Sequence, residues 1–96
     1  MREVYEFPAS NVAKAQELLG KEDITSRQSL YTRTAVSLSI KSDKVYIIID
    51  GSPEALKVAE TLLKTLGKKS ADKDSVLKKF DEIENASAEG FGFLGI

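Results

Sequence analysis

"YTRTAVSLSIKSDKVYIIID", residues 31–50, decides the fold of this 96-residue chain. Its first half alternates polar and apolar residues, which is typical of a β-strand with one buried face. The segment "KSDK" supplies turn residues, with Ser42 and Asp43 at its centre, and every residue from 45 to 49 is apolar. The stretch therefore predicts a β-hairpin whose second strand is buried on both faces.

A strand that is apolar on both faces needs a cover on each of them. In a domain this small, we expect the second cover to be another copy of the chain or a different protein. The sequence leaves open whether Val45, Ile47 and Ile49 or their alternates face the core. We therefore assign the whole run to self-association: Val45, Tyr46, Ile47, Ile48 and Ile49.

The first hairpin strand has two alternating faces. One carries Thr32, Thr34, Val36, Leu38 and Ile40, and the other carries Tyr31, Arg33, Ala35, Ser37, Ser39 and Lys41. The second set consists of small residues framed by basic ones. It predicts a flat surface that suits close packing or a polyanion.

The segments around the hairpin predict further elements. "REVYEF", residues 2–7, indicates a short strand, and "NVAKAQELLG", residues 11–20, a helix capped by Ser10 or Asn11 and ended by Gly20. Residues 21–29 form a polar connection.

A second helix follows the hairpin. Ser52 is its expected N-cap, Pro53 suits the first helical position, and Gly67 ends it. Residues 68–87 indicate a third helix, with apolar residues at helical spacing: Val76, Leu77, Phe80 and Ile83.

The fold class predicted is α+β. We expect a three-stranded antiparallel sheet with two helices on one face, in the order strand-helix-strand-strand-helix, plus a C-terminal helix and an apolar tail. Residues 1–69 form the domain, and residues 70–96 are a C-terminal extension. The domain is mildly basic and the extension acidic.

Composition argues against an enzyme. The chain has no Cys and no His, which excludes disulfides, thiolate zinc sites and Cys nucleophiles and removes the commonest general base. Gly90, Gly92 and Gly95 match G-x-G-x-x-G, but no helix can follow them to hold a pyrophosphate. We expect no cofactor and no metal site, and the lack of a signal-type or membrane-spanning apolar run predicts a cytoplasmic protein with no membrane contact.

Two groups of residues are candidate contacts. The first, for nucleic acid or a partner, is Arg27, Arg33, Thr34, Lys41, Lys57 and Lys64; scattered surface cations are the alternative interpretation. The second is the tail cluster Phe91, Phe93, Leu94 and Ile96, which either folds back onto the domain or docks into a partner.

Residues 2–67 resemble the small KH-like subunit of the KEOPS complex, in the cancer/testis-antigen-like family. The similarity rests on the order of elements, on "ASNVAKAQELLG", on Arg33-Thr34 opening a strand, on "KVYIIID", and on "SPEALKVAETLL", where Lys57 stands in place of an Arg. Residues 68–96 and the Gly51-Ser52-Pro53 step depart from the family pattern.

The resemblance implies a non-catalytic accessory subunit that forms a homodimer. Such a subunit helps a kinase-like catalytic subunit place threonylcarbamoyl on adenosine in tRNA, by scaffolding and tRNA contact. Without the resemblance, the residues indicate a self-associating or partner-binding α+β domain. The alternative functions are a protein-interaction adaptor and a stand-alone KH-like RNA-binding module with no role in tRNA modification.

Overall fold

The computed structural model describes the backbone of residues 1–94 and the side chains of residues 1–85. Within that part the chain is α+β, as predicted, with one four-stranded antiparallel sheet and three α-helices. The strands are β1 (Arg2–Phe7), β2 (Ser29–Thr34), β3 (Val45–Asp50) and β4 (Lys68–Lys69). The α-helices are α1 (Val12–Lys21), α2 (Pro53–Leu63) and α3 (Lys73–Leu94), and short 3-10 turns are η1 (Ala9–Asn11), η2 (Thr25–Arg27) and η3 (Val36–Leu38).

The strand order is β2-β3-β1-β4, so the expected three-stranded sheet has a fourth member. β4 pairs with β1 through Tyr5 opposite Lys69 and Glu6 opposite Lys68. Two consecutive lysines carry no period-two apolar pattern, which is why the sequence did not predict this strand.

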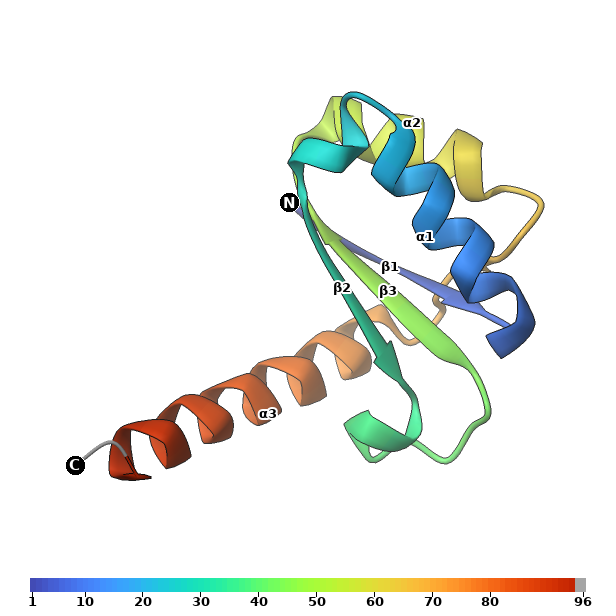
Figure 1. Ribbon diagram of the computed structural model, residues 1–96. Helices are drawn as coiled ribbons and strands as arrows, with labels where there is room; N and C mark the ends of the chain where they lie inside the picture. Colours follow the sequence, from blue (N-terminus) through green and yellow to red (C-terminus); the bar gives the residue numbers. More distant parts are fainter. Residues whose placement is uncertain (95–96) are drawn as a thin grey trace.

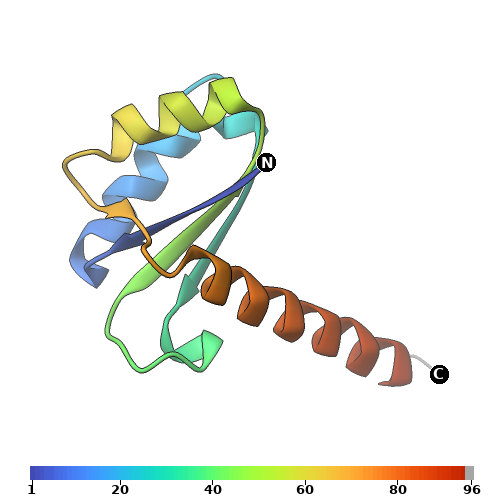
Figure 2. The ribbon, with the colours of Figure 1, turned by 180° about the vertical axis from the view of Figure 1, so that it is seen from behind.

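β3 lies at the centre of the sheet and is buried on both faces, as its composition predicts. Ile47 and Ile49 of β3 face α1 and α2 in what we call the front core: Tyr5, Phe7, Ala15, Leu19, Ile47, Ile49, Ala59 and Leu63. The even-numbered residues face α3 in the back core: Val4, Ala35, Leu38, Tyr46, Ile48, Val76, Leu77 and Phe80. Figures 1 and 2 show α1 and α2 on one side of the sheet and α3 crossing the other.

The cover on the second face of β3 is therefore a helix of the same chain. Residues 45–49 are between 0% and 8% exposed without any partner. Their apolar pattern is accounted for by α1 and α2 on one face and by α3 with Ala35 and Leu38 on the other, so it no longer argues for a second copy. Self-association through these residues remains a prediction, but the need for a second cover, on which it was based, is met by the chain itself.

Specific polar and aromatic contacts fix α3 to the sheet. Arg2 donates two hydrogen bonds to the Asp81 carboxylate, at 2.7 and 3.1 Å. Arg33 donates to Glu84 at 2.9 Å, and its guanidinium lies 5.3 Å from the centre of the Phe80 ring. The Phe80 ring in turn lies 5.2 Å from that of Tyr31. Tyr31, Arg33 and Ala35 of the predicted flat face thus pack against α3, whereas Ser37, Ser39 and Lys41 lie beyond the end of β2.

The first hairpin strand is shorter than predicted, because β2 ends at Thr34 and η3 follows. The Thr34 hydroxyl accepts a hydrogen bond from Ser37 N–H (3.1 Å), and the Ser37 hydroxyl donates to Thr34 C=O (2.7 Å). Such local bonds compete with the sheet ladder. Ser39 then adopts a left-handed conformation (φ 60°), and the break in alternation turns Leu38 into the back core.

The helix boundaries agree in part with the sequence. Ser52 caps α2, accepting from Ala55 N–H at 3.1 Å, with Pro53 as its first residue. Asn11 occupies the N-cap position of α1, as one of the two expected caps, but its side chain makes no capping hydrogen bond and donates its amide to Leu66 C=O at 2.9 Å. Gly20 lies inside α1, which continues to Lys21.

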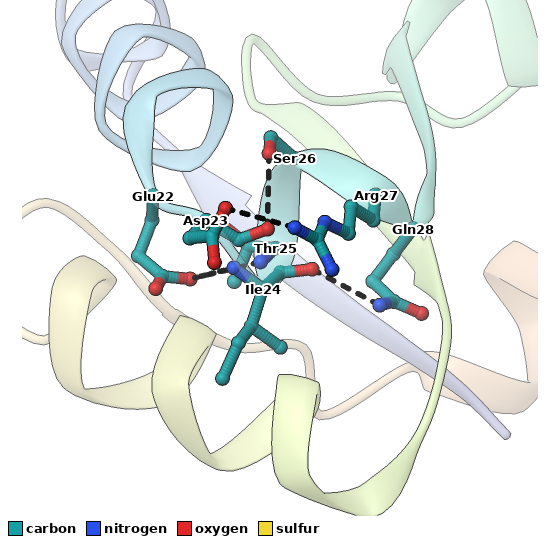
Figure 3. A network of polar contacts seen from close by, with 7 residues as sticks. All are labelled: Glu22, Asp23, Ile24, Thr25, Ser26, Arg27 and Gln28. Carbon is teal, nitrogen blue, oxygen red and sulfur yellow. Dashed lines mark hydrogen bonds and ion pairs between the residues drawn. The ribbon is translucent and has the colours of Figure 1, made fainter.

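The polar connection between α1 and β2 is folded by its own hydrogen bonds (Figure 3). The Glu22 carboxylate accepts from the backbone N–H groups of Ile24 and Thr25, at 2.9 and 2.8 Å. The buried Thr25 hydroxyl donates to Leu19 C=O at 2.7 Å, which ties the connection to the end of α1. The segment positions β2 without needing an apolar period.

Candidate anion-binding site at the sheet edge

The turn from α2 to β4 is pressed against β1 by a glycine. A Cβ added to Gly67 would lie 2.4 Å from both the Glu6 carbonyl oxygen and Cδ1 of Phe7. Only glycine permits this close approach. The approach brings Lys68 and Lys69 into the sheet beside β1 and creates a hollow on each side of the turn.

The first hollow, which we call the basic hollow, has a volume of about 440 Å³. Its lining includes three lysines and one carboxylate: Tyr5, Glu60, Thr61, Leu63, Lys64, Gly67, Lys68 and Lys69. Lys69 lies 3.5 Å from Glu60, so that carboxylate is already neutralised. Lys64 has no ion pair among the side chains that the structure describes.

Tyr5 supplies the least ordinary group in the basic hollow. Its side chain is 2% exposed, and its hydroxyl is buried with no hydrogen-bond partner. Burial, and then the nearby carboxylates of Glu3 and Glu60, raise the pKa of Tyr5 to about 12. The hydroxyl is therefore protonated at neutral pH and remains an unused donor. Lys64, Lys68 and Lys69 line the same hollow, and ammonium groups together with an unused donor are suited to hold an anion.

The second hollow, the apolar hollow, lies on the other side of the turn and measures about 670 Å³. It is lined by Glu6, Phe7, Pro8, Ala9, Asn11, Asp43, Lys44, Thr65, Leu66, Gly67 and Lys68. The Glu6 carboxylate is almost fully buried and lies 3.1 Å from Lys44 and 3.5 Å from Lys68. The hydrogen bond with Glu6 is the main reason that the pKa of Lys44 is raised.

The structure does not gather the predicted contact residues into one surface. Arg33 is bound to Glu84 on the α3 side of the sheet, and Arg27 pairs with Asp23 at 3.2 Å in the exposed connection of Figure 3. Lys41 was expected on the same strand face as Arg33, but it lies in the loop after η3.

The remaining predicted contacts divide differently. The Thr34 hydroxyl is engaged with Ser37 in its own turn. Lys57 is exposed on α2, whose other side covers the front core, and Lys64 lies at the basic hollow. The predicted tail contacts Phe91, Phe93, Leu94 and Ile96 lie outside the residues whose side chains the structure describes.

Three residues of the hollow were missed from the sequence. Tyr5 looks like an ordinary strand residue, and Lys68 and Lys69 look like solvated charges at a helix end. The available signal was the "GKK" step directly after a helix, where glycine can mark a close backbone approach.

No group of three or more acidic side chains within residues 1–85 is placed to hold a metal ion. In the described chain, no helix combines the length and apolar character needed to cross a bilayer. No family model, no curated protein and no solved structure matches this chain.

Proposed function

We propose that this chain is a non-catalytic accessory subunit that contacts RNA in a cytoplasmic tRNA-modifying assembly. The kinase-like catalytic subunit of that assembly would perform the threonylcarbamoyl transfer to adenosine. The observation that carries the proposal is the basic hollow, which is lined by Lys64, Lys68 and Lys69 together with Tyr5, whose hydroxyl is an unused donor. The order of elements over residues 2–67 supports the tRNA context through the resemblance stated above.

The chemistry of the hollow favours binding over catalysis. Lysine ammonium groups attract phosphates through a sequence-independent electrostatic term and release the counterions of the RNA. Tyr5, with its pKa raised to about 12, is a poor proton acceptor at neutral pH. The groups present can hold a phosphate in place, and the chemical step belongs to the partner.

The test is the salt dependence of tRNA binding, measured by fluorescence anisotropy. The variant Lys64→Gln/Lys68→Gln removes two cations from the basic hollow. The matched control Lys14→Gln/Lys78→Gln removes two exposed lysines, one on α1 and one on α3, with the same change in net charge.

We expect the first variant to reduce the slope of log K against log salt by about 2, since each phosphate contact contributes roughly one unit. The control should change the slope by well under one unit. Equal effects of the two variants would show that RNA responds only to net charge, and the proposal would fail.

Self-association is a second candidate, favoured by the outer edge of β2. Ala35 N–H donates to Lys44 C=O at 3.0 Å, and hydrogen-bonded pairs alternate along an antiparallel ladder. The odd-numbered residues of β2 therefore bond to β3, and the even-numbered ones turn their N–H and C=O groups outward. No strand within residues 1–94 pairs with that side, so a second copy of β2 could join it.

Thr32→Pro tests this edge, because it removes one outward N–H and leaves the bonds to β3 intact. Thr32→Val is the control: it keeps the N–H, and both variants lose the same hydrogen bond from Gln16 to the Thr32 hydroxyl. Light scattering should find a dimer for the wild type and for Thr32→Val, and a monomer for Thr32→Pro. A wild-type monomer at all concentrations would exclude the homodimer.

A further inference from the structure

We infer that the basic hollow and the apolar hollow together form a site for one nucleotide of single-stranded RNA. The phosphate group would lie in the basic hollow, and the base with its ribose in the apolar hollow. This inference rests on the proposed function in taking RNA as the ligand, and it adds the unit that is recognised.

The two hollows meet at the same short turn. Gly67 and Lys68 line both of them, so a ligand that passes over the turn touches both hollows at once. The Lys68 ammonium, 3.5 Å from Glu6, lies at this junction. Each hollow falls within the roughly 300–1,000 Å³ typical of small-ligand sites.

The apolar hollow has the lining that a nucleobase requires. Pro8, Ala9 and Leu66 supply carbon surface above the buried Phe7, and Asn11 and Asp43 add polar groups to the lining. A base presents a flat apolar face with hydrogen-bonding edges, and proteins read unstacked bases against apolar or aromatic surface in this way. The Glu6 carboxylate is held by Lys44, so it does not oppose the approach of an anion from that side.

The basic hollow supplies the complementary phosphate end. The unpartnered Tyr5 hydroxyl has lost its hydration on folding without gaining a partner, so an acceptor oxygen placed there recovers a hydrogen bond. Lys64 has no ion pair among the described side chains and supplies the countercharge first, whereas Lys68 and Lys69 each lie 3.5 Å from a carboxylate, that of Glu6 and that of Glu60. The hollow for the base and the hollow for the phosphate are thus joined at one short turn, Gly67-Lys68.

The test titrates the full chain, by nuclear magnetic resonance of its amides, with adenosine 5′-monophosphate, adenosine and inorganic phosphate. We expect the monophosphate to shift the amides of Gly67 and Lys68 and to bind at least tenfold more tightly than either fragment. Tyr5→Phe should weaken the monophosphate about tenfold, the effect of one hydrogen bond to a charged group, and leave adenosine binding unchanged. Thermal unfolding of Tyr5→Phe should show no loss of stability, which separates the binding effect from damage to the fold.

The outcomes distinguish this inference from the proposed function. If the monophosphate binds no more tightly than phosphate, or ignores Tyr5→Phe, the nucleotide site is overturned, while tRNA binding through Lys64 and Lys68 can still hold. If the monophosphate binds as expected and tRNA does not, the RNA role fails and the site remains one for a free nucleotide. Tighter binding of a phosphopeptide or an acidic peptide than of single-stranded RNA would also overturn the inference.

Discussion

Phe80→Ala is the sharpest test of the claim that α3 completes the core. Phe80 is 7% exposed and contacts both the Tyr31 ring and the guanidinium of Arg33. Truncating a buried Phe to Ala typically costs about 3–5 kcal/mol, a value that includes the lost aromatic contact. We expect the free energy of unfolding to fall by about 3 kcal/mol. This is a large share of the total, because small domains have a free energy of unfolding of roughly 5–15 kcal/mol.

The assay is equilibrium unfolding in guanidinium chloride, with Lys78→Ala as the control. Lys78 is exposed on the same helix, so its substitution should change the free energy of unfolding by less than about 0.5 kcal/mol. A loss below about 1 kcal/mol for Phe80→Ala would show that α3 is not packed on the sheet. The midpoint of the Thr32→Pro variant, which is expected to be a monomer, should be independent of protein concentration; a strong dependence would mean that a second copy supplies the cover of the sheet instead of α3.

Three further predictions concern stability and ionisation. Gly20→Ala should stabilise the protein by about 0.5–1 kcal/mol in chemical unfolding, because Gly20 is helical with open space around it, whereas Gly67→Ala should destabilise it by roughly 1–3 kcal/mol through the clash with β1. The hydrogen bond from Arg2 is the main cause of the lowered pKa of Asp81. The stabilisation from this ionised pair is present above pH 3.8, the ordinary pKa of Asp, and is lost as the pH falls through the lower pKa of the folded state. The acid unfolding curves of Asp81→Asn and the wild type should therefore converge at low pH, and a difference in stability that stays constant with pH would contradict this. In absorbance titrations at alkaline pH, Tyr5 should ionise at about 12, so the wild type should lose stability between about pH 10 and 12 as the unfolded chain ionises first, and Tyr5→Phe should lose less.

The sequence predicted the helices and strands better than the contacts between them. The pattern of residues 45–49 correctly indicated a strand buried on both faces, and the spacing of Val76, Leu77 and Phe80 indicated a helix with one apolar side. Periodicity is local, however, and does not say which surface a helix will cover. The pairing of Arg33 with Glu84 joins residues 51 positions apart, so no window of the sequence contains both.

The candidate site was less accessible to sequence reasoning. Lys64 was named as a contact, but Lys68, Lys69 and Tyr5 were not, because their common hollow exists only where Gly67 lets the turn approach β1. The unused hydroxyl of Tyr5 is also invisible in a sequence, since any buried tyrosine is expected to find a partner.

The position of α3 after the sheet has a consequence for biosynthesis. All strands of the sheet are translated before α3, so the side chains of Val4, Tyr46 and Ile48 stay uncovered until Val76 and Phe80 of α3 pack on them. Once residues 1–69 have left the ribosome, they can assemble the front core while the opposite apolar face of the sheet is still exposed to water. That interval is when a chaperone would bind this protein or when two unfinished chains would adhere, and slow elongation across residues 70–85 would prolong it.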